Sequence, residues 1–201
     1  MRSMTFRHLP GRCQTCWIRL EHCICADLPR VLTRTQLVVV RHEWEANKST
    51  GTARIASLAL PNTRIVDYGD DPTEADQALG QLEHAQLLYP ADPPSTWPAQ
   101  LDGPLVVLDG TWRQTRKMFR KLSRLRHLPR LSLPPKPGPI LRLRSAHFDD
   151  ARSTLEAIAD ALRLLEGDAV AAPLDALHAR YVERIFRARG VWDLKHKAFA
   201  G

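Results

Sequence analysis

Residues 105–121 read Leu-Val-Val-Leu-Asp-Gly-Thr-Trp-Arg-Gln-Thr-Arg-Lys-Met-Phe-Arg-Lys, and this stretch decides the fold class. Its first four residues, Leu105 to Leu108, predict a buried strand, and a helix is expected from Trp112 to about Arg126. Along most of the chain, similar strand-sized apolar runs alternate with helical periods. Such alternation is typical of an α/β domain with a mainly parallel sheet flanked by helices.

The other elements follow from the same periodicities and from capping signals. Strands are expected at residues 36–40, 65–68, 85–89, 131–133 and 140–143. Helices are expected from Ser49 or Thr50 to Leu60, from Asp71 to about Glu83, from Ser153 to Gly167, and from Pro173 to about Arg189. Residues 90–104 form a proline-rich loop that is too long for a simple connection, so we expect it to contribute to function.

The chain has 201 residues and an ordinary globular composition, with 44% hydrophobic and 25% charged residues. No apolar run approaches the roughly 18 residues that span a bilayer, which excludes a membrane protein. The first residues lack the apolar stretch of a secretory signal, so a cytoplasmic location is expected. A formal net charge of +7, from 29 Lys and Arg against 22 Asp and Glu, favours an acidic partner.

The excess positive charge is concentrated in the helix that follows the strand 105–108. Between Arg113 and Arg130 there are eight basic residues and no acidic one, whereas the other 21 basic residues are balanced by 22 acidic ones. Six of the eight fall on one stripe of a helix with 3.6 residues per turn: Arg113, Arg116, Lys117, Arg120, Lys121 and Arg124. The alternative is a solvated face, but solvated faces usually mix charges. We therefore expect the stripe to bind phosphates.

All four cysteines lie in one short window, as Cys13-Gln14-Thr15-Cys16 and Cys23-Ile24-Cys25. In an intracellular chain such clustering favours a metal site over disulfides, and four thiolates suit tetrahedral Zn²⁺. Four protein ligands leave no open position, so the predicted zinc is structural. Reduced buried cysteines and a redox-active pair are the alternatives. We expect residues 1–34 to form a zinc-binding segment and residues 35–201 to form the main domain.

A carboxylate follows directly after the predicted strand 105–108. In a parallel α/β sheet the carboxyl ends of the strands border the ligand-binding crevice, so Asp109 is expected to point into it. Gly110 permits a sharp turn or a close ligand, and the start of the next helix offers N–H groups to an anion. The alternative is a simple helix N-cap, for which Asp109 or Thr111 would serve.

Several ordered motifs resemble the DTW-domain family. The motif that names the family is Asp109-Gly110-Thr111-Trp112, followed here by basic residues. The resemblance extends to the N-terminal CxxC and CxC pairs, to Arg41-His42-Glu43-Trp44-Glu45, to Lys48-Ser49-Thr50-Gly51-Thr52-Ala53-Arg54, and to Ser153-Thr154-Leu155-Glu156-Ala157. Many relatives have Asn at the position of Gly51. The similarity covers roughly residues 10 to 190.

The resemblance implies a tRNA-uridine aminocarboxypropyltransferase. Such an enzyme transfers the 3-amino-3-carboxypropyl group of S-adenosylmethionine to N3 of a uridine in tRNA and releases methylthioadenosine. It also implies a SPOUT-like, knotted α/β domain that holds the donor at the carboxyl ends of its strands. The sulfonium leaves as a neutral thioether, but N3 must lose its proton. Asp109 is the candidate base, strengthened by desolvation, or it orients the uracil or the sulfonium carbon.

The same resemblance implies a donor site. Its expected residues are Leu88, Tyr89, Pro90, Leu108, Gly110, Thr111, Trp112, Arg144, Ser153, Thr154 and Glu156. The methionyl carboxylate needs a cation or a helix N-terminus, and the candidates are Arg142, Arg144, Arg152 and the helix start at Ser153.

Some of these residues have simpler uses. Glu156 is expected to be the reciprocal cap of Ser153, an interpretation that we prefer to a donor contact. Trp112 lies on the apolar stripe of its helix, which favours core packing over stacking on a base. His42, Glu43 and Lys48 are placed on the uridine side, with Lys48 as a further RNA contact, or they form an ordinary charged loop.

Two alternative functions stay open. One is an RNA methyltransferase of the same fold that uses S-adenosylmethionine, in which another sulfonium carbon is attacked. The other is a non-catalytic, zinc-containing RNA-binding protein, against which the intact Asp109 motif argues. The sequence is compatible with a monomer or a homodimer and shows no obligatory protein partner, and the resemblance implies tRNA as the partner.

Overall fold

The computed structural model describes residues 10–136, 143 and 152–192. Its strands are β1 Leu37–His42, β2 Thr63–Tyr68, β3 Gln86–Leu88, β4 Leu105–Asp109 and β5 Arg130–Leu131. Its α-helices are α1 Glu43–Ala46, α2 Thr52–Ala59, α3 Thr73–Gly80, α4 Trp112–Lys121, α5 Ser123–His127, α6 Thr154–Glu166 and α7 Asp168–Ala188. Two 3-10 turns, η2 Leu20–His22 and η3 Cys25–Asp27, precede β1. The predicted α/β class is confirmed.

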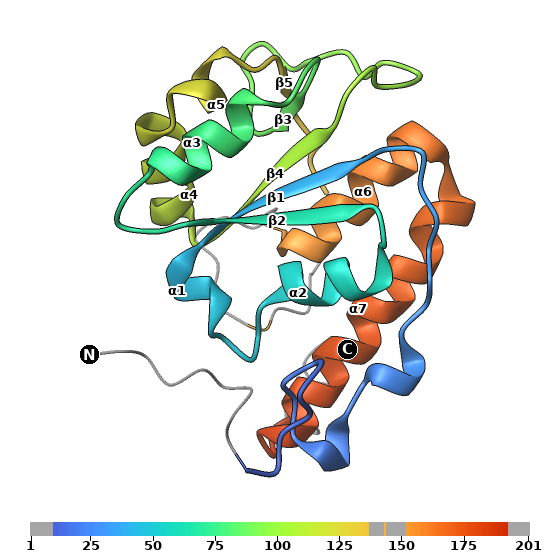
Figure 1. Ribbon diagram of the computed structural model, residues 1–201. Helices are drawn as coiled ribbons and strands as arrows, with labels where there is room; N and C mark the ends of the chain where they lie inside the picture. The colour runs from blue at the N-terminus through green and yellow to red at the C-terminus, as the bar shows by residue number, and fades with distance from the viewer. Residues whose placement is uncertain (1–9, 137–142, 144–151, 193–201) are drawn as a thin grey trace.

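The five strands form one parallel sheet in the order β2-β1-β4-β3-β5 (Figure 1). Val39 of β1 lies opposite Ile65 of β2 on one side and Val107 of β4 on the other. Because all strands run the same way, their carboxyl ends share one edge of the sheet. The long central strands are almost continuously apolar, as expected for strands that are buried on both faces.

Helices cover both faces of the sheet. One layer contains α2, α6 and α7, and the opposite layer contains α3, α4 and α5 (Figure 1). Alternate residues of β1 and β4 enter the two cores, because successive strand side chains point to opposite faces. Val39 and Val107 pack in the α2/α6/α7 core, and Val38 and Val106 pack in the opposite one.

The cysteine-containing N-terminal segment packs beside α7 (Figure 1). Cys16, Ile18 and Ile24 are buried in the same hydrophobic core as α6 and α7. Asp27 forms ion pairs with Arg180 at 3.9 Å and Arg184 at 3.5 Å. Apolar and ionic contacts thus attach this segment to α7.

The prediction of one continuous helix from Trp112 to Arg126 is wrong, because the chain leaves helical geometry at Leu122 (ψ 110°). A distant residue explains the break. Asp76 of α3 accepts hydrogen bonds from the Ser123 hydroxyl at 2.6 Å and from the Arg124 amide at 3.0 Å, so it caps the start of α5. The basic residues therefore lie on two short helices, with Arg124 on the second.

Other predicted boundaries also shift. The last helix begins at Asp168, with Pro173 inside it, because Gly167 (φ 90°) reverses the chain within a single residue after α6. The N-cap of α2 is Gly51 rather than Ser49 or Thr50.

Some strand and helix ends were also predicted too far along the chain. Helix α3 ends at Gly80, and β5 covers only Arg130–Leu131. The strand predicted at 140–143 falls mostly outside the described residues. Within the described ranges, no helix is long and apolar enough to span a bilayer.

Gly103 aligns the start of β4 with the turn before β3. A Cβ atom at Gly103 would lie 2.3 Å from the Glu83 carbonyl oxygen and 2.6 Å from the His84 carbonyl carbon. Because backbone cannot yield as a side chain can, we expect Gly103→Ala to lower the free energy of unfolding by about 2 to 3 kcal/mol. Urea denaturation measures this value.

The control for this substitution is Gly69→Ala. At Gly69 a Cβ atom would meet only the Glu43 carboxylate, at an ordinary 3.4 Å. We expect its unfolding free energy to stay within about 0.5 kcal/mol of wild type. Equal stability of both variants would show that Gly103 does not set this alignment.

Candidate active site

Asp109 ends the central strand β4 at the carboxyl edge of the sheet. Only 5% of its surface is exposed. Its Oδ1 atom accepts a 2.5 Å hydrogen bond from the hydroxyl of Thr154, the first residue of α6. The carboxylate is therefore held between the end of the central strand and the start of a helix, at the carboxyl edge of the sheet.

The start of α6 is organised by a capping box. Ser153 accepts a hydrogen bond from the Glu156 amide at 3.3 Å, and Glu156 Oε2 accepts one from the Ser153 amide at 2.9 Å. His178 of α7 lies 3.1 Å from the Ser153 hydroxyl, and burial lowers the pKa of His178. The preferred interpretation of Glu156 as a reciprocal cap is confirmed, and the cap fixes Thr154 next to Asp109.

A second capping box follows Asp109. Thr111 donates its amide to Gln114 Oε1 at 2.7 Å, and its hydroxyl accepts the Gln114 amide at 3.4 Å. Thr111 is thus the N-cap of α4, and Asp109 is not. A Cβ atom at Gly110 would lie 3.1 Å from Gln114 Cβ, so glycine fits the tight passage from strand to helix.

Three aromatic rings stack beside this turn. The rings of Tyr89 and Trp112 lie 5.8 Å apart at an interplanar angle of 12°, and those of Tyr89 and Phe119 lie 4.7 Å apart at 10°. Trp112 is 38% exposed, so its predicted burial in the core is wrong. Trp112 is the first residue of α4 and directly follows the turn that leaves the end of β4. Tyr89 joins it there because β3 ends at Leu88, next to β4.

The basic side chains of α4 and α5 are all exposed. Within residues 10–136, 143 and 152–192, no ion pair involves the six residues of the predicted stripe. Lys117 lies over the Tyr68 ring at 6.0 Å, and Arg130 lies at the same distance from the Phe119 ring. A cationic surface therefore borders the aromatic stack. We call the exposed residues Arg113, Arg116, Lys117, Arg120, Lys121 and Arg124 the basic surface.

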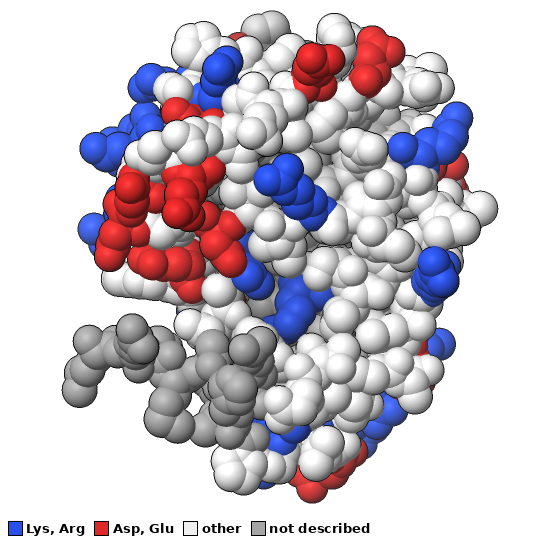
Figure 2. Space-filling model, viewed as in Figure 1, with Lys and Arg blue, Asp and Glu red and all other residues white. Residues whose placement is uncertain are grey.

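Another part of the same edge is acidic. Figure 2 shows Asp and Glu side chains gathered over α1 and the loop that leads to α3. The acidic residues of this region are Glu43 of α1, Asp67 of β2, Asp70 and Asp71 of the loop and Glu74 of α3, and all are at least partly exposed. Arg41 is paired with Asp67 through two hydrogen bonds of 2.7 and 2.9 Å.

The residues assigned to the uridine side have local partners. His42 caps α1 by accepting the Trp44 amide at 3.3 Å, and burial lowers its pKa. Lys48 forms a 2.5 Å ion pair with Glu45, which is buried. Lys48 therefore already has a counter-charge within the protein.

The four cysteine sulfurs lie within 4.8 Å of one another. Cys13 and Cys25 are 3.5 Å apart, and Cys16 and Cys23 are 3.7 Å apart. A tetrahedral zinc with Zn–S bonds of about 2.3 Å places its sulfurs about 3.8 Å apart, so the four thiols fit such an ion. Although burial opposes it, hydrogen bonds from the amides of Cys16 and Thr15 lower the pKa of Cys13 to about 6.

Arg54 was part of a recognised motif but had no predicted role. It lies in the first turn of α2 and is only 8% exposed. Its guanidinium carbon stacks 3.5 Å from the centre of the Trp17 ring, and Asp109 is close enough to influence its pKa. The sequence does contain one signal of a functional role for Arg54, which is an arginine on an apolar helix face. Arginine is almost never buried without a partner.

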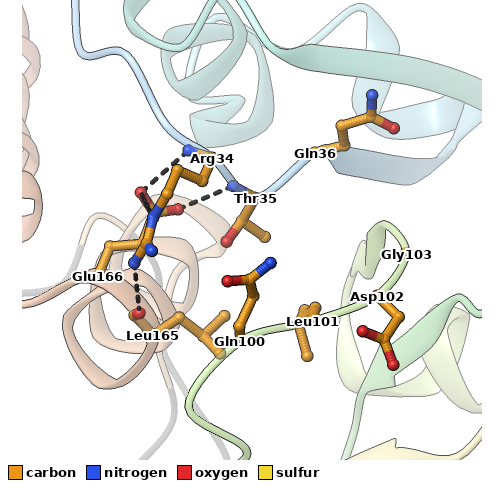
Figure 3. A pocket seen from close by; sticks show the side chains of 9 residues that line it. All are labelled: Arg34, Thr35, Gln36, Gln100, Leu101, Asp102, Gly103, Leu165 and Glu166. Carbon is orange, nitrogen blue, oxygen red and sulfur yellow. Dashed lines mark hydrogen bonds and ion pairs between the residues drawn. The ribbon is translucent and has the colours of Figure 1, made fainter.

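A cavity of about 270 Å³ lies elsewhere, at the amino ends of β1 and β4 (Figure 3). Gln36 and Gly103 line it, together with Arg34, Thr35, Gln100, Leu101, Asp102, Leu165 and Glu166. Glu166 accepts the amides of Arg34 and Thr35 at 3.0 and 2.9 Å, which ties the end of α6 to the start of β1. The cavity is at the edge opposite Asp109, so we do not assign it to the active site.

The sheet edge thus brings many of the predicted donor residues together. Leu88, Tyr89, Pro90 and Leu108 lie at or after the ends of β3 and β4, beside Gly110, Thr111 and Trp112. Arg152 pairs with Asp160 at 2.7 Å, so it is already neutralised as a candidate for the methionyl carboxylate. Arg142 and Arg144 lie outside the described residues.

Fold and site together define an α/β protein with a buried carboxylate at the carboxyl edge of a parallel sheet, next to an exposed cationic surface. The chain matches the model of the DTW domain over residues 11–186, and it belongs to that family.

Two curated relatives are similar to the chain. It is 29% identical over 167 residues to tRNA-uridine aminocarboxypropyltransferase 2 of Macaca fascicularis. The aligned region covers 77% of this chain and 56% of the relative. It is 26% identical over 173 residues to the protein of the same name from Drosophila melanogaster, covering 78% of this chain and 67% of the relative. The chain therefore spans little more than half of the macaque protein. No solved structure matches it.

Proposed function

We propose that this chain transfers the 3-amino-3-carboxypropyl group of S-adenosylmethionine to N3 of a uridine in tRNA. The observation that carries the proposal is Asp109, buried at the end of β4 and fixed by the Thr154 hydroxyl. The names of the curated relatives support the reaction class. We keep the cytoplasm as the expected location.

The residues at the sheet edge suit such a donor. A sulfonium cation is favoured beside a carboxylate, and Asp109 supplies one. The Tyr89 and Trp112 rings offer flat apolar surfaces to an adenine. When bound, S-adenosylmethionine supplies an electrophilic carbon activated by its sulfonium.

The proposed step needs one base and no acid. The N3–carbon bond forms as the carbon–sulfur bond breaks, and the electron pair of that bond leaves on sulfur, which becomes a neutral thioether. Asp109 takes up the N3 proton. The Thr154 hydroxyl fixes the orientation of this carboxylate.

The first prediction concerns the reaction and its base. With unmodified tRNA and S-adenosylmethionine, we expect aminocarboxypropyluridine and methylthioadenosine in equal amounts by mass spectrometry. Asp109→Asn keeps the shape but removes the base, so the transfer rate should fall on the order of 100-fold or more. Asp102→Asn, at the exposed opposite edge, is the control and should keep the wild-type rate.

Other outcomes of this assay contradict the proposal. Adenosylhomocysteine as the product would identify a methyltransferase. Retained tRNA binding without turnover would indicate a binding protein. An unchanged rate for Asp109→Asn would remove the base role.

The second prediction concerns the basic surface, to which we assign the tRNA backbone. Removal of one phosphate-binding side chain should flatten the slope of log binding constant against log salt by about 0.7 to 0.9. We expect Arg113→Ala/Arg116→Ala to weaken tRNA binding in filter-binding titrations and to flatten this slope. The matched double variant Arg30→Ala/Arg64→Ala removes two exposed arginines elsewhere and should bind as wild type does. Equal slopes for both variants would place the tRNA on another surface.

The third prediction concerns the cysteines, which we propose hold one structural Zn²⁺. Elemental analysis should find about one zinc per chain, and Cys13→Ser should lose it together with a substantial part of the stability. Gln14→Ala lies in the same loop but changes no ligand, so it should keep the metal. Native protein without zinc would contradict the assignment.

A further inference from the structure

Arg54 is a buried cation whose hydrogen bonding is incomplete within the protein. Its Nη2 atom donates to the Lys48 carbonyl oxygen at 2.6 Å. Its Nε and Nη1 atoms are buried and have no hydrogen-bond partner among the described residues, and no described ion pair includes it. Unpartnered N–H groups in the protein interior cost free energy. An arginine in this state therefore indicates a ligand that accepts its remaining hydrogen bonds.

The loop that contains Cys13 and Cys16, which with Cys23 and Cys25 form the cysteine cluster, contacts one face of the Arg54 guanidinium through Trp17. Trp17 follows Cys16, and its amide donates to the Cys13 carbonyl at 3.0 Å, while its indole N–H donates to the Gln14 carbonyl at 3.1 Å. Trp17 has a left-handed backbone (φ 64°) that presents its ring to Arg54. Stacking on the ring occupies one face of the guanidinium and leaves its N–H groups in the plane for an acceptor.

The surroundings favour a small anion over a nucleic-acid backbone. Burial lowers the pKa of Arg54 to about 10, while Tyr181, Cys16 and Asp109 raise it and Arg41 lowers it, so the group stays charged near neutral pH. Arg54 belongs to α2, in the layer opposite α4 and the basic surface (Figure 1). Arg54 is 8% exposed, so the carboxylate of a small molecule can reach it more readily than a phosphate of folded RNA can.

We propose that Arg54, stacked on Trp17, binds the α-carboxylate of the aminocarboxypropyl donor. This inference rests on the proposed function. The donor's carboxylate is bonded to the carbon that bears its amino group, two carbons from the sulfonium-bound carbon, so a cation near Asp109 lies where it is needed. Arg54 completes its hydrogen bonds with the donor, and Trp17 is a positioning residue that links the cysteine cluster to donor binding.

The test compares three ligands that share the adenosine and the thioether or sulfonium. S-adenosylmethionine has the carboxylate, decarboxylated S-adenosylmethionine lacks it, and methylthioadenosine lacks the whole transferred group. Isothermal titration calorimetry with wild type should show tighter binding of the first than of the second. In Arg54→Met the affinity for S-adenosylmethionine should fall roughly 10- to 100-fold, with little change for the other two ligands.

Further variants separate this role from a loss of folding. Arg54→Lys keeps the charge and should recover part of the preference for S-adenosylmethionine. Trp17→Ala should reduce that preference while zinc stays bound. Arg64→Met removes an exposed arginine of β2 and should bind all three ligands as wild type does. Unchanged methylthioadenosine affinity in each variant reports an intact site.

Two results would overturn the inference alone: an Arg54→Met protein that still prefers S-adenosylmethionine over its decarboxylated form, or one that loses affinity only for tRNA. The latter would assign Arg54 to a phosphate. Wild-type protein that does not bind S-adenosylmethionine would overturn the proposed function as well.

Discussion

The hydrogen bond between Asp109 and Thr154 joins the central strand to the start of α6, and the site is arranged around it. A carboxylate that is 5% exposed needs donors inside the protein, because water is largely excluded. Thr154 can reach Asp109 only if α6 begins at the carboxyl edge of the sheet, and the Ser153–Glu156 capping box fixes that beginning. The Thr154 hydrogen bond and this capping box therefore fix the start of α6, its position on the sheet and the orientation of the candidate base.

Exposed charges of opposite sign are separated around the same edge of the sheet. The acidic residues over α1 and the loop before α3 repel a phosphate backbone, whereas the basic surface attracts it. The tRNA backbone that we propose as the partner is therefore expected on the α4 side of the sheet, next to Tyr89 and Trp112. The α2 side contains the recessed cation Arg54, to which we assign the small-molecule donor.

Features that depend on local sequence were predictable. The strand ending at Asp109, the capping box at Ser153, the clustering of four cysteines and the exposed basic residues follow from periodicity and spacing, and the structure confirms them. The motif comparison also led to the family to which the chain belongs.

Features that depend on distant partners were not predictable. The break at Leu122 requires Asp76, which lies 47 residues before Ser123 in the chain. The exposure of Trp112 depends on where α4 passes the end of the sheet. The burial of Arg54 requires Trp17 from the cysteine cluster and the layer of α6 and α7. In each case the local sequence is compatible with a regular helix, and tertiary contacts determine where the helix ends or which side chain is buried.

The position of Arg54 gives the N-terminal cysteines a reason to be part of this domain. A structural metal site far from the chemistry would need only to stabilise its own loop. Here the loop that contains Cys13 and Cys16 also sets the backbone of Trp17, and the ring of Trp17 covers a guanidinium within electrostatic range of Asp109. A buried cation and a buried carboxylate at one edge of the sheet attract opposite charges on a third molecule. A zwitterionic amino acid attached to a sulfonium has charges of both signs, which makes it the kind of donor that this pair can hold in one orientation.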